Sequence, residues 1–248
     1  MALYVVYRAP TESKARSTIP TRLKDLGCKQ IHRAVWKINE KKVNYILKVL
    51  ENNQPIILKR LREIKNPKIC KKKKVARLGS LIIVIFALPE GANREKVKNY
   101  LKRAACIRLR RSVYAFSQKH SFYEKEPKLV DALKLVNFIK ENQGKVKIIS
   151  RVVIENSTSV ERLLQETTER VEQRASDIIS SCKGIYVKAL KGSNYGVLRD
   201  RFSRIKRRYL ILKKVVSVYE AWLKIDFSKS LMRAYHAIRK VDLIINPT

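Results

Sequence analysis

The amino-acid sequence contains one pattern twice, and this duplication restricts the possible folds more than any other feature. Residues 3–60 can be aligned with residues 82–151, first at an offset of 79 (Val5 with Val84) and then at 78. The pairs at the second offset are Leu23 with Leu101, Lys24 with Lys102, Cys28 with Cys106, Arg33 with Arg111, Val35 with Val113 and Trp36 with Tyr114. Chance spacing does not readily preserve such a series, so we predict two copies of one structural unit.

Each copy has the pattern strand, helix, strand, helix, strand. An apolar, β-branched run opens each copy and ends in a turn with a proline. In the first copy, Pro20 is expected in the first turn of a helix that Gly27 ends. The pattern is typical of a ferredoxin-like, split βαβ unit, with room for one more hairpin strand before the second helix. The predicted strands are 3–7, 31–38 and 56–64 in the first copy and 81–86, 107–116 and 146–154 in the second.

After Glu155 the apolar period changes to that of a coiled coil. From Leu198 to Leu223 apolar residues recur at alternating steps of four and three, and a less regular seam runs from Val160 to Cys182. Residues 184–196 would connect these segments as an antiparallel hairpin, followed by a short helix at 231–241 that caps the bundle. The predicted fold is therefore α+β, with two tandem ferredoxin-like repeats at 1–64 and 81–155, a basic linker at 65–80, and a helical hairpin with a C-terminal helix at 156–248.

Charge is the strongest indication of function. The 248 residues include 56 Lys and Arg but 21 Asp and Glu, which gives a net charge of +35. Such an excess is far more than solubility requires, and it favours a polyanionic partner. The hydrophobic content of 45% excludes a disordered basic tail. Because we find no secretory signal and no apolar run long enough to span a membrane, we expect a cytoplasmic protein without a membrane partner.

Residue types that serve catalysis or metal binding are scarce. His32, His120 and His236 each stand alone, and the four cysteines are too widely spaced for a metal or redox motif. We therefore predict buried thiols, no enzyme activity, no metal, no cofactor and no catalytic residue.

Basic residues in the linker and in the second strands are candidate contacts to phosphate. Lys71, Lys72, Lys73, Lys74 and Arg77 occur without an acidic residue, which fits either a segment that tracks phosphates or a solvated loop. Arg33 and Arg111 hold the same position in the two copies, inside an apolar stretch. They fit either two related phosphates or side-chain stems that lie over a helix edge.

Two further sets of arginines are candidates. Arg108 and Arg110 alternate along a strand whose aromatic residues, Tyr114 and Phe116, either stack on unpaired bases or belong to the core. The second hairpin helix lies either across a groove of nucleic acid or with its basic face in solvent. The arginines on this helix are Arg201, Arg204, Arg207 and Arg208.

The second copy also contains a series of short motifs, FALP at 86–89 and RRSVY at 110–114, with Arg94, Val97 and Leu101 between them. Together with the helical hairpin, this series resembles the amino-terminal region of ChrB-type chromate-resistance regulators over residues 82 to about 215. More widely, both copies resemble the ferredoxin-like units of PaaX-type repressors and of the small nuclease that acts in CRISPR adaptation. The resemblance implies DNA binding in the control of transcription.

Nuclease activity does not follow from this resemblance. The active CRISPR nuclease carries an aspartate at the end of its first strand to hold a metal, whereas this chain has YRAP at 7–10 and FALP at 86–89. The sensing domain of full ChrB regulators is not recognisable after residue 215. We therefore predict a non-enzymatic DNA-binding transcriptional regulator that contacts backbone phosphates. The alternatives are an RNA-binding or ribosome-associated protein and, third, a degenerate relative of the CRISPR nuclease.

Overall fold

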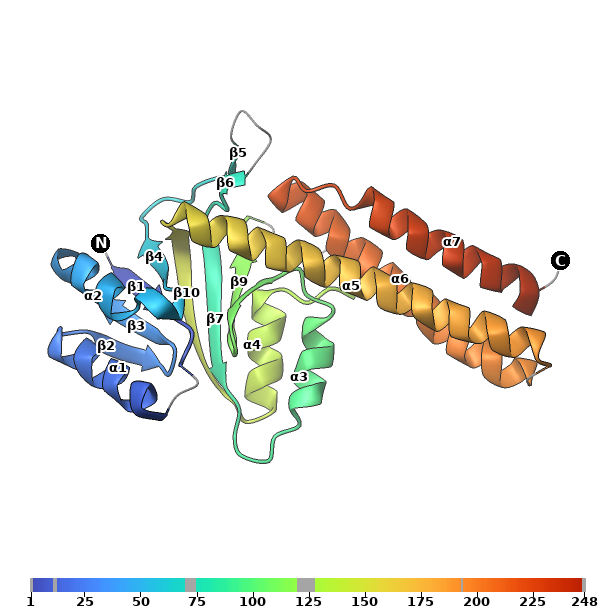
Figure 1. Ribbon diagram of the computed structural model, residues 1–248, viewed down its shortest axis with the longest axis horizontal. Helices are drawn as coiled ribbons and strands as arrows, with labels where there is room; N and C mark the ends of the chain where they lie inside the picture. Colours follow the sequence, from blue (N-terminus) through green and yellow to red (C-terminus); the bar gives the residue numbers. More distant parts are fainter. Residues whose placement is uncertain (1, 11–12, 70–74, 120–127, 193, 247–248) are drawn as a thin grey trace.

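The centre of the protein is one eight-stranded, entirely antiparallel β-sheet, as a computed structural model shows over residues 2–10, 13–69, 75–119, 128–192 and 194–246 (Figure 1). The strand order is β2-β3-β1-β4-β10-β7-β9-β8, and β5 and β6 form a separate two-stranded sheet. The fold is thus of the α+β class. The strands are β1 (Leu3–Val6), β2 (Lys29–His32), β3 (Val35–Ile38), β4 (Ile56–Arg60), β5 (Lys68–Ile69), β6 (Val75–Arg77), β7 (Leu81–Ala87), β8 (Ile107–Arg110), β9 (Val113–Ser117) and β10 (Lys145–Ile154).

The two halves of the sheet have the same pairing register. Residues that the sequence alignment makes equivalent also have equivalent partners across the strands. In both halves the edge hairpin contains a register shift, which falls just before His32 in β2 and just before Arg110 in β8. The halves meet where β10 pairs with β4. The equivalent pairs are Val5 with Trp36 and Gln30 with Trp36 in the first half, and Val84 with Tyr114 and Arg108 with Tyr114 in the second.

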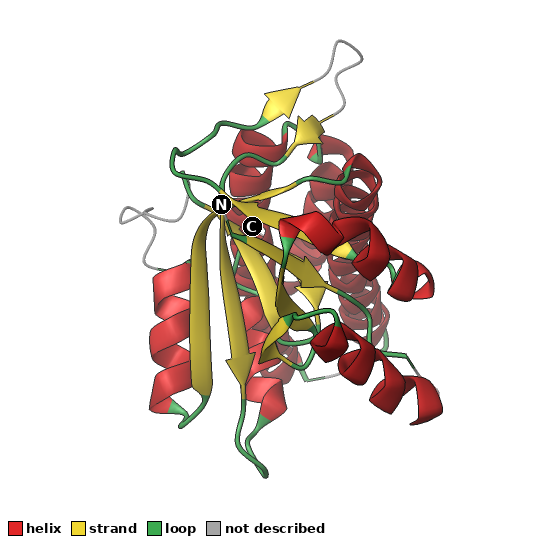
Figure 2. Ribbon diagram, turned by 90° about the vertical axis from the view of Figure 1, so that its left-hand side faces the viewer, coloured by secondary structure: helices red, strands yellow, loops and turns green. Residues whose placement is uncertain are grey.

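Two helices cover one face of each half of the sheet. Alternate residues of a strand point to opposite faces, so Val5 packs into a cluster with α1 and α2, and Val84 into a cluster with α3 and α4. The other face of both halves, which carries Val6 and Ile83, packs against the C-terminal helices, so helices lie on both sides of the strands (Figure 2). Asn93 and Asp131 cap α3 and α4 by accepting hydrogen bonds from the first-turn amides of Lys96 and Lys134. The helices are α1 (Ser13–Asp25), α2 (Val43–Val49), α3 (Arg94–Leu101) and α4 (Ala132–Glu141), with short 3-10 helices at Glu40–Lys42 and Glu51–Asn53.

The C-terminal third forms a three-helix bundle of α5 (Ser157–Leu190), α6 (Tyr195–Leu223) and α7 (Ser228–Ile245). The first turns of α5 cross the sheet, and the helix then continues far beyond it beside α6 and α7 (Figure 1). Leu163 of α5 shares the largest apolar cluster with Ile107 and Leu109 of β8, so this bundle packs on the sheet face opposite to α3 and α4. Trp222 of α6 is fully buried and donates its indole N–H to the carbonyl of Leu78 at 2.9 Å.

The predicted helix ends differ from the structure in two places. Pro20 lies inside α1, which begins at Ser13 rather than near Pro20, although Gly27 does follow the helix with a φ of +78°. Gly184 lies inside α5, so the connection to α6 is only residues 191–194 rather than 184–196.

The structure also differs from the predictions for the last helix and for the second strand of each copy. The C-terminal helix, α7, has 18 residues and runs along the bundle instead of capping it. Each predicted second strand is a two-stranded hairpin, and β4 ends at Arg60. Over the described residues, no helix combines the length and the apolar character that crossing a membrane requires.

Candidate nucleic-acid interface

Arg33 and Arg111 lie in turns and not inside strands as predicted. Each is the first residue of the two-residue turn in its edge hairpin, and each is exposed. In the second turn, Ser112 adopts a left-handed φ of +63°. The two arginines are thus equivalent in the duplication, but their hairpins stand at opposite ends of the strand order.

The aromatic residues near Arg108 belong to the core. Phe116 is buried, and Tyr114 stacks on Phe86 with 5.9 Å between the ring centroids and 5° between the ring planes. Arg108 itself is exposed on β8. Phe116 is therefore enclosed and Tyr114 is half-buried against Phe86, whereas the exposed Arg108 can contact a phosphate.

Arg77 lies at the end of β6 and is exposed beside an open cleft of about 640 Å³. Lys59, Lys65 and Lys68 also line this cleft, against a single carboxylate from Glu155. The predicted contacts Lys71, Lys72, Lys73 and Lys74 lie outside the described residues.

The four arginines predicted on the second hairpin helix are all exposed on α6. Arg201, Arg204 and Arg208 follow one another at steps of three and four, so they share one face of the helix. Arg207 is exposed beside them.

Sequence reasoning missed three arginines on α5. Arg162, Arg170 and Arg174 lie at multiples of four residues from one another, so one face of α5 carries all three. The structure places this face against β8 and α6, where it meets arginines of both elements. We call Arg108, Arg170, Arg174 and Arg208 the arginine row, and Arg110 with Arg162 the arginine pair.

Electrostatic effects link the members of the arginine row through two shared groups, Tyr114 and Arg174. Burial raises the pKa of Tyr114, and the Arg108 and Arg170 guanidiniums beside the ring oppose that rise. Burial lowers the pKa of Arg174, and the charges of Arg170 and Arg208 lower it further. Among the described residues, no carboxylate lies within ion-pair distance of any arginine in the row. The row is therefore a set of arginines from β8, α5 and α6 that form no ion pair among the described residues.

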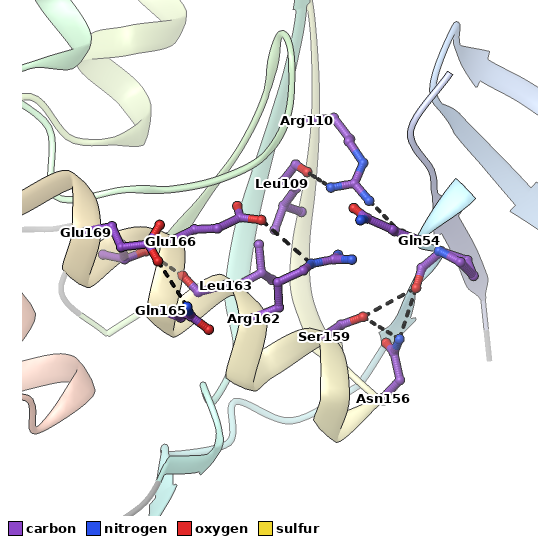
Figure 3. Close-up of polar contacts among 12 residues, drawn as sticks. Gln54, Leu109, Arg110, Asn156, Ser159, Arg162, Leu163, Gln165, Glu166 and Glu169 are labelled. Carbon is purple, nitrogen blue, oxygen red and sulfur yellow. Dashed lines mark hydrogen bonds and ion pairs between the residues drawn. The ribbon is translucent and has the colours of Figure 1, made fainter. Parts of the chain in front are cut away.

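The arginine pair lies at the other end of β8, in a more enclosed place (Figure 3). Arg110 donates to the carbonyl of Gln54 at 2.5 Å and to that of Leu109 at 2.8 Å. Arg162 approaches Glu166, with 3.7 Å between Nε and the carboxylate. Burial lowers the pKa of Arg110 to about 10, and the neighbouring Arg162 charge contributes to this shift.

The described residues contain no group of three or more His, Cys, Asp or Glu side chains arranged to hold a metal ion. Comparison of the chain with protein-family models, with curated proteins and with solved structures finds no match.

Proposed function

We propose that this protein binds the sugar–phosphate backbone of nucleic acid through the arginine row. The observation that carries the proposal is the gathering of Arg108, Arg170, Arg174 and Arg208 without a carboxylate partner in the described part of the chain. Bringing like charges together raises the electrostatic free energy of the folded protein. A polyanion along the row would remove this repulsion and gain the free energy of counterion release.

The proposal includes a finer description of the fold as two ferredoxin-like units, residues 1–64 and 81–155, with a basic linker at 65–80. Its support is that each half of the sheet has the connectivity βαββαβ and the same order of strands, read from either edge inwards. The matching position of the register shift in the two edge hairpins favours duplication of one unit.

Duplex DNA is the first candidate ligand, because the resemblance to ChrB-type and PaaX-type proteins implies DNA binding in transcription control. Arginines that contact phosphates fix the position of a protein on a duplex but carry no sequence information. Tight but weakly sequence-dependent binding is therefore expected of the row. RNA is the alternative ligand, and a direct comparison decides between the two.

The test is the affinity for a fluorescent duplex DNA and for a duplex RNA of the same sequence, measured by anisotropy. The double variant Arg108→Glu with Arg208→Glu removes the two exposed ends of the row. We expect it to weaken binding by about tenfold or more, since two phosphate contacts become repulsive.

The matched control is Arg22→Glu with Lys24→Glu, two exposed residues of α1 that change the net charge equally. This control should change the affinity less than about threefold at the same salt concentration. Equal losses in both double variants would show that net charge alone attracts the nucleic acid, and would contradict the proposal.

A further inference from the structure

The protein backbone holds Arg110 in place, and Arg162 lies beside it with 26% of its side chain exposed. Arg110 is the last residue of β8, and the register shift after Arg108 aims its side chain towards the loop that precedes β4. There the guanidinium is fixed by the carbonyls of Gln54 and Leu109. Arg162 comes from the second turn of α5, and its guanidinium points into the same space as that of Arg110 (Figure 3).

Both guanidiniums carry buried N–H groups without a hydrogen-bond partner. These groups are Nε of Arg110 and both Nε and Nη2 of Arg162. Glu166 does not satisfy them, because 3.7 Å is too long for a hydrogen bond and its side chain is 44% exposed. Buried donors on charged groups are costly to leave unpaired. Glu166 therefore offsets part of the positive charge of the pair, and it opposes the lowering of the Arg110 pKa, but three buried donors stay without a hydrogen-bond partner among the described residues.

We propose that Arg110 and Arg162 together bind a single phosphate group. Two planar guanidiniums offer forked donors that match the oxygens of a phosphate, and a dianion would neutralise both charges at once. A third positive charge, that of Arg8, acts on Arg110 from the first half of the sheet.

The duplication offers an internal comparison for this site. His32 is the equivalent of Arg110 in the first half, and it also follows the register shift of its hairpin. Burial lowers the pKa of His32, and the charges of Lys147 and Arg33 lower it further, so this imidazole is neutral at pH 7. The first half therefore lacks the paired cations, and one phosphate per chain is expected.

The phosphate belongs either to a nucleic-acid backbone or to a free phosphorylated molecule, and the chemistry of the site is the same for both. This inference concerns the arginine pair and not the arginine row, so it does not depend on the proposed function.

Thermal unfolding in inorganic phosphate tests the site, with chloride at matched ionic strength as the reference. The wild-type melting temperature should rise with phosphate and reach a plateau. In Arg162→Gln the melting temperature without phosphate should equal or exceed that of the wild type, because the repulsion with Arg110 is gone. The same variant should bind phosphate about tenfold more weakly or worse, as expected for the loss of charge-assisted hydrogen bonds.

Two further variants make the result specific. Arg111→Gln removes an equal charge from the neighbouring exposed turn and should keep the whole phosphate response. Arg110→Lys keeps the charge at its position but loses the fork, and its phosphate affinity should fall below that of the wild type. An undiminished, saturable response in Arg162→Gln would overturn the site, as would an equal loss in Arg111→Gln.

The affinity of Arg162→Gln for duplex DNA then identifies the source of the phosphate. A loss of about tenfold, parallel to the loss of phosphate binding, assigns the phosphate to the nucleic-acid backbone. Unchanged DNA affinity assigns it to a free phosphorylated molecule. If the wild type binds no nucleic acid but shows a phosphate response that needs Arg162, the proposed function is wrong and the phosphate site stands.

Discussion

The hydroxyl of Tyr219 donates a hydrogen bond to the backbone carbonyl of Cys106 at 2.8 Å, which ties α6 to the residue directly before β8. Both residues are buried, and Arg170 of α5 donates to the same carbonyl oxygen at 3.3 Å. Burial strongly raises the pKa of Tyr219, so its hydroxyl remains a donor at any physiological pH. One carbonyl thus fixes the two long helices relative to the strand that carries Arg108.

Replacing Tyr219 with Phe should lower the free energy of unfolding by about 1 to 2 kcal/mol, because a buried carbonyl loses one of its two donors. Urea unfolding measures the change. Tyr195→Phe is the matched control, since this tyrosine is 46% exposed, and it should leave the stability unchanged. Equal stability of Tyr219→Phe and the wild type would mean that the bond contributes nothing.

Cys106 and Cys182 should resist alkylation in the folded protein. Burial raises the pKa of Cys106 to about 12 and that of Cys182 to about 11, so neither forms the reactive thiolate at pH 8. Iodoacetamide labelling followed by mass spectrometry should find both unmodified in buffer and both modified in urea. Rapid labelling of either thiol without urea would contradict the assignment.

The raised thiol pKa also means that the free energy of unfolding falls as the pH rises above 9. An unfolded thiol loses its proton near pH 9, whereas the folded Cys106 keeps its proton up to about pH 12. The stabilisation is therefore complete below pH 9 and is lost as the pH rises from 9 to 12, by at most about 1.4 kcal/mol per pH unit for this group. Cys106→Ala should show a smaller loss of stability between pH 9 and pH 11, as measured by urea unfolding.

Binding to duplex DNA should weaken steeply with salt. We expect log K to fall with log salt at a slope of about −5 to −9, which corresponds to about 6 to 10 phosphate contacts. The Arg108→Glu and Arg208→Glu double variant should reduce the steepness by about 2, because two contacts are lost. A wild-type slope near zero would exclude phosphate neutralisation as the source of affinity.

Changing Lys71, Lys72, Lys73 and Lys74 together to Ala should weaken binding to every sequence alike and should hardly change the melting temperature. The reason is that an acid-free lysine run gains affinity through phosphate contacts and has little fold to support. The control changes four exposed lysines elsewhere, Lys24, Lys37, Lys41 and Lys48, to Ala. Unchanged affinity of the linker variant would identify the run as a solvated loop.

Arg33→Glu and Arg111→Glu should both leave the protein folded, since exposed turn positions cost within about 0.5 kcal/mol when substituted. Their effects on DNA affinity should differ. Arg111 adjoins β8, which carries Arg108 of the row, so its reversal should weaken binding more than reversal of Arg33 on the other edge hairpin. Equal losses would favour one phosphate-facing surface that both halves share. A fall in melting temperature with either variant would indicate that the stem of that arginine packs on the protein and supports the fold.

The sequence could predict the elements whose pattern is local. The apolar runs that became β1 and β7, the α5 and α6 seams and the mixed α+β class all follow from periodicity. The alignment offset also predicts which residues hold equivalent places, and Val5 with Val84 is an example confirmed by strand pairing.

The missed turns and helix ends have physical reasons. The turns at Arg33-Ala34 and Arg111-Ser112 contain no Gly, Pro, Asn or Asp, so the sequence pattern predicts one continuous strand in place of each hairpin. A proline inside a helix removes one backbone hydrogen bond, so the sequence favours Pro20 as a helix start, yet α1 contains it at an interior position. In the next position, Thr21 donates its hydroxyl to the carbonyl of Ser17 at 3.1 Å.

The arginine row could not be predicted from any one segment. The spacing of Arg162, Arg170 and Arg174 is visible in the sequence, but the carboxylates of Glu161, Glu169 and Glu172 make α5 look acidic. Only the packing of α5 on β8, where Leu163 meets Ile107 and Leu109, shows which face of the helix is turned to the sheet and which acidic side chains are left exposed. Tertiary packing, and not local pattern, decides the chemistry of this surface.

The sheet has two matching halves but only one helical bundle, and this asymmetry determines how the protein would be oriented on a duplex. Two-fold symmetric proteins present the same surface twice and fit palindromic duplexes. Here α5, α6 and α7 follow the second half alone, and the row combines β8 with two of these helices. A duplex bound along the row would therefore meet different protein at its two ends. Each chain would lie on DNA with a head and a tail, and would point in one direction along the strand.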